Sequence, residues 1–135
     1  MTRSEQREQA FLLIFERTFK DENLEEILES AELARDLEIT DFAKQIFNGV
    51  IANQNKIDSL IDSNSVGWKK ERLSRVTLSA LRLAIYEMLY EDSIPKGVSI
   101  NEAVEIVKKY GTKGDSSFTN GILSGVYKEL KSNNV

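Results

Sequence analysis

The sequence predicts an all-α protein that forms a single domain over residues 1–135. Apolar residues recur at helical spacing along most of the chain, no stretch alternates as a strand would, and Pro95 is the only proline. About seven segments carry the helical pattern, and short connections join them, which is typical of a helical bundle. A chain of 135 residues is long enough to bury a core without a metal ion or a disulfide.

Three of the expected helices lie in the N-terminal half. The first is expected to begin at Thr2 or Ser4, because Thr2 and Glu5 have the spacing of a capping box and an apolar stripe follows. This stripe consists of Phe11, Leu12, Phe15 and Phe19. A short acidic helix is expected over residues 24–33, and one long helix is expected over residues 41–62.

The C-terminal half contains a helix that is apolar on nearly all sides, over residues 78–91. Such a helix is buried on most sides, so we expect it at the centre of the fold. Before it, residues 68–73 are expected to form a short helix with exposed basic side chains. After a proline break, Ser99 and Glu102 have the spacing of a capping box, and the helix that they start is expected to end at Gly111.

The stretch FTNGILSGV is expected within the last helix, which begins near Ser116 or Ser117, although Asn-Gly is a strong turn signal. Helical spacing continues through Phe118, Ile122, Val126 and Leu130. Glycines cost helix propensity, so we expect Gly121 and Gly125 to let the buried helix at 78–91 pack closely. Phe118 and Asn120 then lie in the first turn, where a ring and an amide reach outward.

The sequence lacks the residues that most active sites and metal centres need. It contains no histidine and no cysteine, which removes the commonest general base, the thiol nucleophile and most transition-metal ligands. The carboxylate pairs Asp58/Asp62 and Glu87/Glu91 have helical i,i+4 spacing and are interpreted as solvated helix faces. These features predict a protein that is not an enzyme and that needs no metal and no cofactor.

The net charge of −4 does not exclude a nucleic-acid partner, because the charge is unevenly distributed. Nine of the 22 acidic residues lie within residues 21–41, so the rest of the chain is mildly basic. Basic side chains next to an exposed aromatic ring and an amide suit single-stranded RNA, since they offer charge for phosphates, a stacking surface and a base-edge contact. The candidate RNA-binding residues are Arg3, Arg7, Arg72, Lys109, Phe118 and Asn120.

Residues 72–123 contain, in order, the stretches RLSRVTLSALRLAIYEM, IPKGVSINEAVEIVKKYG and FTNGIL. In this order and spacing they closely resemble the NusB family of bacterial transcription antitermination factors. The stretches REQAFLLIFE and FNGVIANQNKIDSLI match the N-terminal half of that family more loosely. The resemblance covers nearly the whole chain. It implies two three-helix bundles packed around a central helix, which agrees with the buried helix expected at 78–91.

The resemblance also implies a function and its partners. Proteins of this family bind the boxA element of nascent RNA, especially in ribosomal RNA operons, together with NusE, a small-subunit ribosomal protein. The pair helps assemble an RNA polymerase antitermination complex that reads through terminators. Mapped onto this sequence, the RNA-facing positions include Arg3, Arg7, Phe118 and Asn120. The NusE-facing positions are Phe15, Thr77 and Arg82.

Two other interpretations remain open at this stage. One is a non-catalytic protein-binding helical scaffold or homodimer. The other is an RNA-targeting module related to those of ribosomal RNA methyltransferases. The chain has no apolar run of the roughly 20 residues that a bilayer span needs and no signal-peptide pattern, so a cytoplasmic location without membrane contact is expected.

Overall fold

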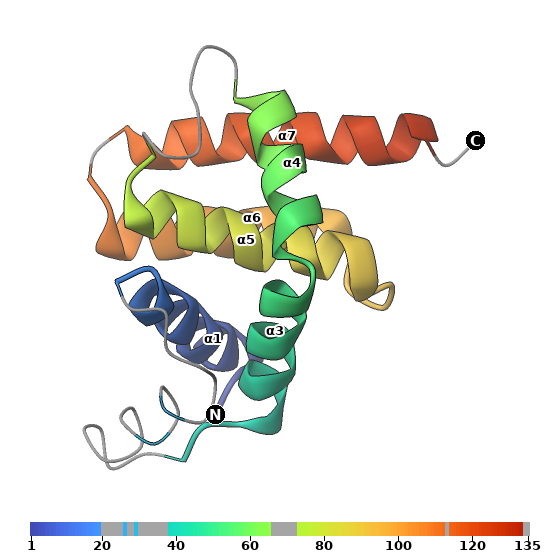
Figure 1. Cartoon of the computed structure of the whole chain (residues 1–135). Coiled ribbons are helices and arrows are strands. Elements are labelled where there is room, and N and C mark those ends of the chain that lie inside the picture. The colour runs from blue at the N-terminus through green and yellow to red at the C-terminus, as the bar shows by residue number, and fades with distance from the viewer. Residues whose placement is uncertain (20–25, 27–28, 30–37, 66–72, 113, 134–135) are drawn as a thin grey trace.

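Six helices make up the described part of the computed structural model, and this part contains no strand, which confirms the all-α fold class (Figure 1). The structure describes residues 1–19, 26, 29, 38–65, 73–112 and 114–133. The helices are α1 (Arg3–Arg17), α3 (Asp41–Ala52), α4 (Gln54–Asn64), α5 (Arg75–Tyr90), α6 (Lys96–Tyr110) and α7 (Asp115–Asn133). The helices expected at 24–33 and 68–73 lie almost wholly outside the described residues.

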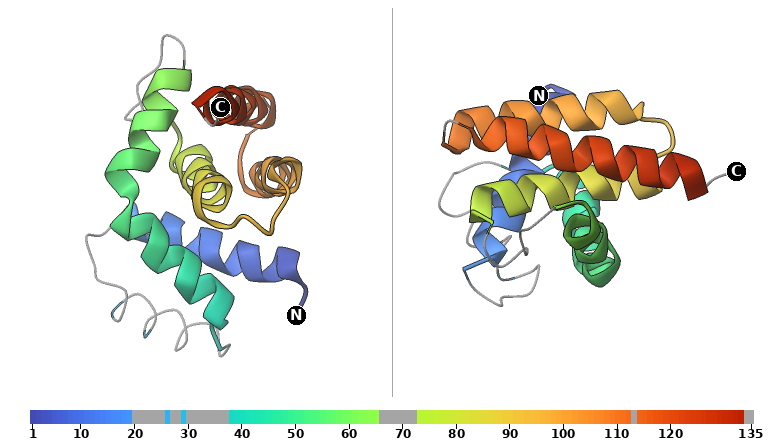
Figure 2. Two further views of the ribbon diagram at one scale, coloured as in Figure 1. Left: turned by 90° about the vertical axis from the view of Figure 1, so that its right-hand side faces the viewer. Right: turned by 90° about the horizontal axis from the view of Figure 1, so that it is seen from above.

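Helix α5 occupies the central position that was expected for residues 78–91. It contacts every other described helix, and most of its side chains are buried, with Leu81 and Ile85 fully so. Helices α1 and α3 pack against each other and against α5, while α6 and α7 pack together on another side of it (Figure 2). Helix α4 contacts both α5 and α7. The apolar character of α5 on nearly all sides therefore reflects neighbours on several sides.

The predicted start of the first helix is confirmed. The Thr2 hydroxyl accepts a hydrogen bond from the Glu5 backbone N–H at 3.1 Å, and the Glu5 carboxylate accepts one from the Thr2 backbone N–H at 2.9 Å. This reciprocal pair is a capping box, and it satisfies two backbone donors that the helix leaves free. The hydroxyls of Thr40 and Ser74 cap α3 and α5 by accepting hydrogen bonds from the backbone N–H groups of Ala43 and Thr77.

The prediction of one long helix over residues 41–62 is wrong, because the chain breaks at Asn53 between α3 and α4. Asn53 has φ −118° and ψ 18°, and both its backbone N–H and its side-chain amide donate to the Gly49 carbonyl. An asparagine side chain that binds nearby backbone competes with the helical ladder. The Tyr90 hydroxyl donates to Asn53 at 2.9 Å, so α5 holds the break in place.

The capping box expected at Ser99 and Glu102 is also wrong. Helix α6 begins earlier, at Lys96, with Pro95 at its N-cap. Ser99 is buried within the helix, and its hydroxyl donates to the Glu87 carboxylate at 2.8 Å. Glu102 accepts a hydrogen bond from the Ser4 hydroxyl at 2.7 Å. Both side chains therefore serve contacts between helices, which spacing within one helix does not reveal.

Close packing of the central helix was expected at both glycines of α7. This expectation is wrong for Gly121, and at Gly125 the close neighbour belongs to another helix. Gly121 is exposed, and an added Cβ there would meet no atom within 4 Å. At Gly125 a Cβ would lie 2.5 Å from the side-chain oxygen of Asn64, which belongs to α4 rather than to the central helix. The Asn-Gly pair itself does lie inside a helix, as expected.

Candidate nucleic-acid and partner interface

Two helix ends and two helix starts gather on one side of the molecule. Helices α1 and α6 end there, and α5 and α7 begin there, on the left in Figure 1. We use the name α6–α7 corner for Lys109 and Tyr110 at the end of α6 and Phe118 and Asn120 in the first turns of α7. The corner therefore brings together three of the residues that the sequence analysis assigned to RNA.

The connection between α6 and α7 fixes the orientation of the corner. The Asp115 carboxylate accepts hydrogen bonds from the Thr112 backbone N–H at 3.0 Å and from its hydroxyl at 2.8 Å. Gly114 has φ +103°, a left-handed conformation that glycine adopts without strain. The Phe118 backbone N–H donates to the Gly114 carbonyl, which starts the helical ladder of α7.

Phe118 and Asn120 differ in burial. Phe118 is half-buried and packs against the hydrophobic core, so part of its ring remains at the surface. Asn120 is exposed, two positions further along α7. A ring that is partly held by the core is positioned for stacking, and an exposed amide reaches a base edge.

Lys109 is exposed but forms an ion pair with α1. Its Nζ lies 2.6 Å from Oε1 of Glu8, and the Tyr110 hydroxyl donates to the same oxygen. Burial raises the pKa of Glu8, but hydrogen bonds from Lys109 and Tyr110 outweigh it and lower this pKa below its usual value. The Glu8 carboxylate raises the pKa of Lys109 in turn. The pair therefore consists of two fully charged groups at neutral pH.

The two N-terminal arginines lie in different environments. Arg3 is exposed, and its guanidinium lies 4.0 Å from the ring centre of Phe42. The expectation that Arg7 is a surface residue is wrong: it is 4% exposed, and its Nε lies 2.7 Å from the carboxylate of Glu87. A second carboxylate, of Glu102, lies 3.6 Å from its guanidinium. Glu87 sits in the buried central helix and requires a cation, which α1 supplies.

Phe15 belongs to a row of aromatic side chains along α1. Its ring centre lies 6.0 Å from that of Phe11 and 5.1 Å from that of Phe19. Phe19 is 59% exposed, and the guanidinium of Arg75, at the start of α5, lies 4.3 Å from its ring centre. Arg75 also donates to the Thr18 carbonyl. Sequence patterns do not reveal Phe19 and Arg75 as a partner surface, because their contact joins the segment after α1 to the start of α5, far away in the sequence.

The remaining predicted residues are not at this surface. Thr77 is 2% exposed. The guanidinium of Arg82 forms a bidentate pair with Asp58, with nitrogen–oxygen distances of 2.9 and 3.0 Å. Their side chains are 11% and 8% exposed, so the pair lies inside the fold. Arg72 lies outside the described residues.

The interpretation of the carboxylate pairs as solvated faces is wrong for Asp58 and Glu87, whereas Asp62 is exposed and Glu91 is partly exposed, as expected. Asp58 and Glu87 are buried and paired with arginines, whereas Glu91 accepts a hydrogen bond from Gln45. Within the described residues, no group of three acidic side chains is placed to hold a metal ion. None of the described helices is long and apolar enough to cross a membrane.

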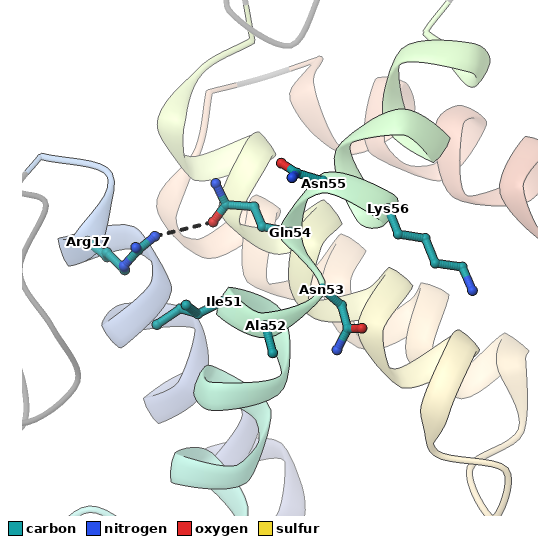
Figure 3. A pocket seen from close by; sticks show the side chains of 7 residues that line it. All are labelled: Arg17, Ile51, Ala52, Asn53, Gln54, Asn55 and Lys56. Atoms are coloured by element: carbon teal, nitrogen blue, oxygen red, sulfur yellow. Dashed lines mark hydrogen bonds between the residues drawn. The ribbon is translucent and has the colours of Figure 1, made fainter.

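An open pocket lies at the junction of α3 and α4 (Figure 3). It is lined by Arg17, Ile51, Ala52, Asn53, Gln54, Asn55 and Lys56. The Arg17 guanidinium donates to the Gln54 side-chain oxygen at 3.3 Å. The lining consists of amides, two cations and two aliphatic side chains and contains no nucleophile paired with a general base, so it does not form a catalytic centre.

The described part of the chain thus defines a helical protein with binding surfaces. The model of the NusB family matches residues 4–128. The transcription antitermination protein NusB of Clostridium botulinum (strain Loch Maree / Type A3) is 42% identical over 137 residues, covering 91% of this chain and 97% of that protein. The chain belongs to the NusB family. This confirms the resemblance seen in the sequence and the prediction of a non-catalytic protein.

Solved structures agree with this assignment. The structure of T. maritima NusB superposes with a TM-score of 0.85 at 37% identity, covering 100% of this chain and 99% of that chain. A structure of the antitermination factors NusB and NusE in complex with dsRNA matches with a TM-score of 0.83 at 28% identity, covering 96% of this chain and 99% of that chain.

Proposed function

We propose that the protein is a transcription antitermination factor that binds the boxA element of nascent RNA together with NusE. The pair then helps to assemble an RNA polymerase antitermination complex. The observation that carries the proposal is the α6–α7 corner, where a half-buried ring, an exposed amide and a lysine gather on the surface. A related chain of the same fold occurs with NusE and RNA in a solved structure, which supports the same assignment.

We infer that RNA contacts Phe118 by stacking, Asn120 by hydrogen bonding, and Lys109 and Arg3 by charge. Arg7 has a different role in this proposal, because its guanidinium is buried between two carboxylates. It fixes α1 against α5 and α6 and so positions the surface residues of α1. Few phosphate contacts in an acidic protein imply modest affinity for RNA alone, which a basic partner protein would raise.

The partner surface that the structure favours consists of Phe15, Phe19 and Arg75. Half-exposed aromatic rings next to an arginine are typical of residues that dominate binding energy in protein interfaces. Thr77 and Arg82 lie inside the fold, so we assign them to the support of this surface rather than to contact with the partner.

Fluorescence anisotropy with labelled boxA RNA, with and without NusE, tests the proposal. Phe118→Ala is expected to weaken binding by about 1–3 kcal/mol through loss of stacking, while circular dichroism shows an intact fold. Tyr127→Ala removes an aromatic ring that is 37% exposed on the same helix and serves as the matched control. Binding that is insensitive to boxA mutations and to NusE would contradict the proposal and favour a protein-binding scaffold or a homodimer, which light scattering would reveal.

We further infer the finer architecture and the location from family membership. In the NusB family resemblance, two three-helix bundles would pack around the central helix, which is α5 here. A factor that acts on nascent bacterial RNA would work in the cytoplasm.

A further inference from the structure

We propose that Glu8 holds Lys109 in an internal ion pair that RNA must displace, so that Glu8 limits the affinity of the protein for RNA. The inference rests on the proposed function and concerns how its binding surface is controlled. It makes Glu8, a residue of α1, an affinity-determining residue for a surface on α6 and α7.

The geometry of the pair is that of a strong contact between two helices. The Lys109 Nζ lies 2.6 Å from the Glu8 carboxylate, across 101 positions of sequence. Lys109 is 61% exposed and Glu8 is 25% exposed, so the lysine faces solvent while the acid lies partly beneath it. The Tyr110 hydroxyl donates to the same Glu8 oxygen, and the Tyr110 ring packs 5.2 Å from the ring centre of Phe11. Glu8 is therefore held in position by two donors of α6.

This arrangement places a negative charge where a phosphate would approach Lys109. A lysine that is paired with a carboxylate contributes little net charge, so it releases few counterions when a phosphate arrives. The carboxylate also repels that phosphate. The low pKa of Glu8 keeps it ionised at neutral pH. This repulsion lowers the affinity for non-specific RNA, which binds mainly through phosphates. It does not weaken stacking at Phe118.

The chain provides a matched comparison on the same helix. Lys108 and Glu105 form an i,i+3 ion pair at 3.4 Å in which both side chains are 58% exposed. Such a pair is solvated and contributes little. Glu8→Gln and Glu105→Gln change the net charge by the same amount, so any difference between them arises from the position of the charge.

The experiment measures the affinity of the full chain for boxA RNA in the presence of NusE, over a range of salt concentrations. Glu8→Gln is expected to tighten binding about two- to fivefold, which is the scale of an exposed ion pair. It is also expected to steepen the salt dependence by up to about one phosphate contact. Glu105→Gln is expected to have a smaller effect. The gain is expected to disappear in Glu8→Gln/Lys109→Gln, because no freed lysine remains.

Lys109→Gln provides a second measurement, made in both the wild-type and the Glu8→Gln background, with circular dichroism as the check that each variant folds. It is expected to weaken RNA binding less in the wild-type background than in the Glu8→Gln background. Equal affinities of wild type and Glu8→Gln, or equal gains in Glu8→Gln and Glu105→Gln, would overturn the inference while leaving the proposed function intact. If the wild type binds no boxA RNA even with NusE, the proposed function itself is wrong, and the role of Glu8 falls with it.

Discussion

Replacing Arg7 tests whether the ion pair beneath the binding surface holds the fold together. In the structure Arg7 is 4% exposed and Glu87 is 1% exposed, and their charged groups lie 2.7 Å apart. Arg7→Met keeps an unbranched apolar stem and removes the charged guanidinium. Glu87 then keeps only the Ser99 hydroxyl, at 2.8 Å, and remains a buried carboxylate without a cation.

The size of the effect follows from this geometry. Breaking a buried pair by removing one partner costs about 3–5 kcal/mol, because the remaining charge is uncompensated. Glu87→Gln is expected to cost less than Arg7→Met, since Arg7 retains a second carboxylate, of Glu102, at 3.6 Å. The double variant Arg7→Met/Glu87→Gln leaves no charge at the Arg7–Glu87 contact. It is therefore expected to recover about 2 kcal/mol or more relative to Arg7→Met.

Urea unfolding monitored by circular dichroism gives the free energies for this double-mutant cycle. A loss below about 1 kcal/mol in Arg7→Met would show that the pair is solvated rather than buried, and the structural role assigned to Arg7 would be wrong. The same conclusion would follow if Arg7→Met kept its stability but lost RNA affinity, since that result is expected of a surface contact.

Three further predictions concern single positions. Gly121→Ala is expected to raise the free energy of unfolding by about 0.5–1 kcal/mol in urea titrations, because alanine favours a helix and the site is open. Gly49→Ala is expected to lower the thermal midpoint, since its Cβ would lie 2.0 Å from the Tyr86 ring. The pKa of Glu8 is lowered in the fold, so its contribution to stability is present above its unfolded value and disappears as the pH falls through the folded value. Carbon NMR titration of Glu8 is expected to show a higher pKa in Lys109→Gln.

Periodicity and local chemistry predicted the helices that depend on neighbours in the sequence. The capping box at Thr2 and the burial of residues 78–91 follow from short spacings, and both are confirmed. The break at Asn53 was missed because apolar periodicity continues through it, while the hydrogen bonds that interrupt the helix come from one asparagine side chain. Local rules therefore predicted where helices exist better than where they stop.

The accessibility of the candidate site residues could be predicted only where it depends on a residue's own helix. Phe118 and Asn120 lie in the expected turn of α7, and their accessibility is a local property of that turn. Arg7 was assigned to the RNA-binding surface because it is basic and lies at a position that the family resemblance maps to RNA, yet its environment is decided by Glu87, 80 positions away.

One signal for the Arg7 contact was nevertheless present in the sequence. A glutamate within a helix that is apolar on nearly all sides has no route to water, so a cation from another helix must reach it. Glu87 is the one acidic residue within α5, so this rule requires a cationic partner for Glu87. Among the arginines and lysines of the chain, it favours one that lies between apolar positions of its own helix, as Arg7 does beside Ala10 and Phe11. An acidic residue in the sequence of a buried helix therefore indicates a contact with a cation of another helix rather than an exposed charge.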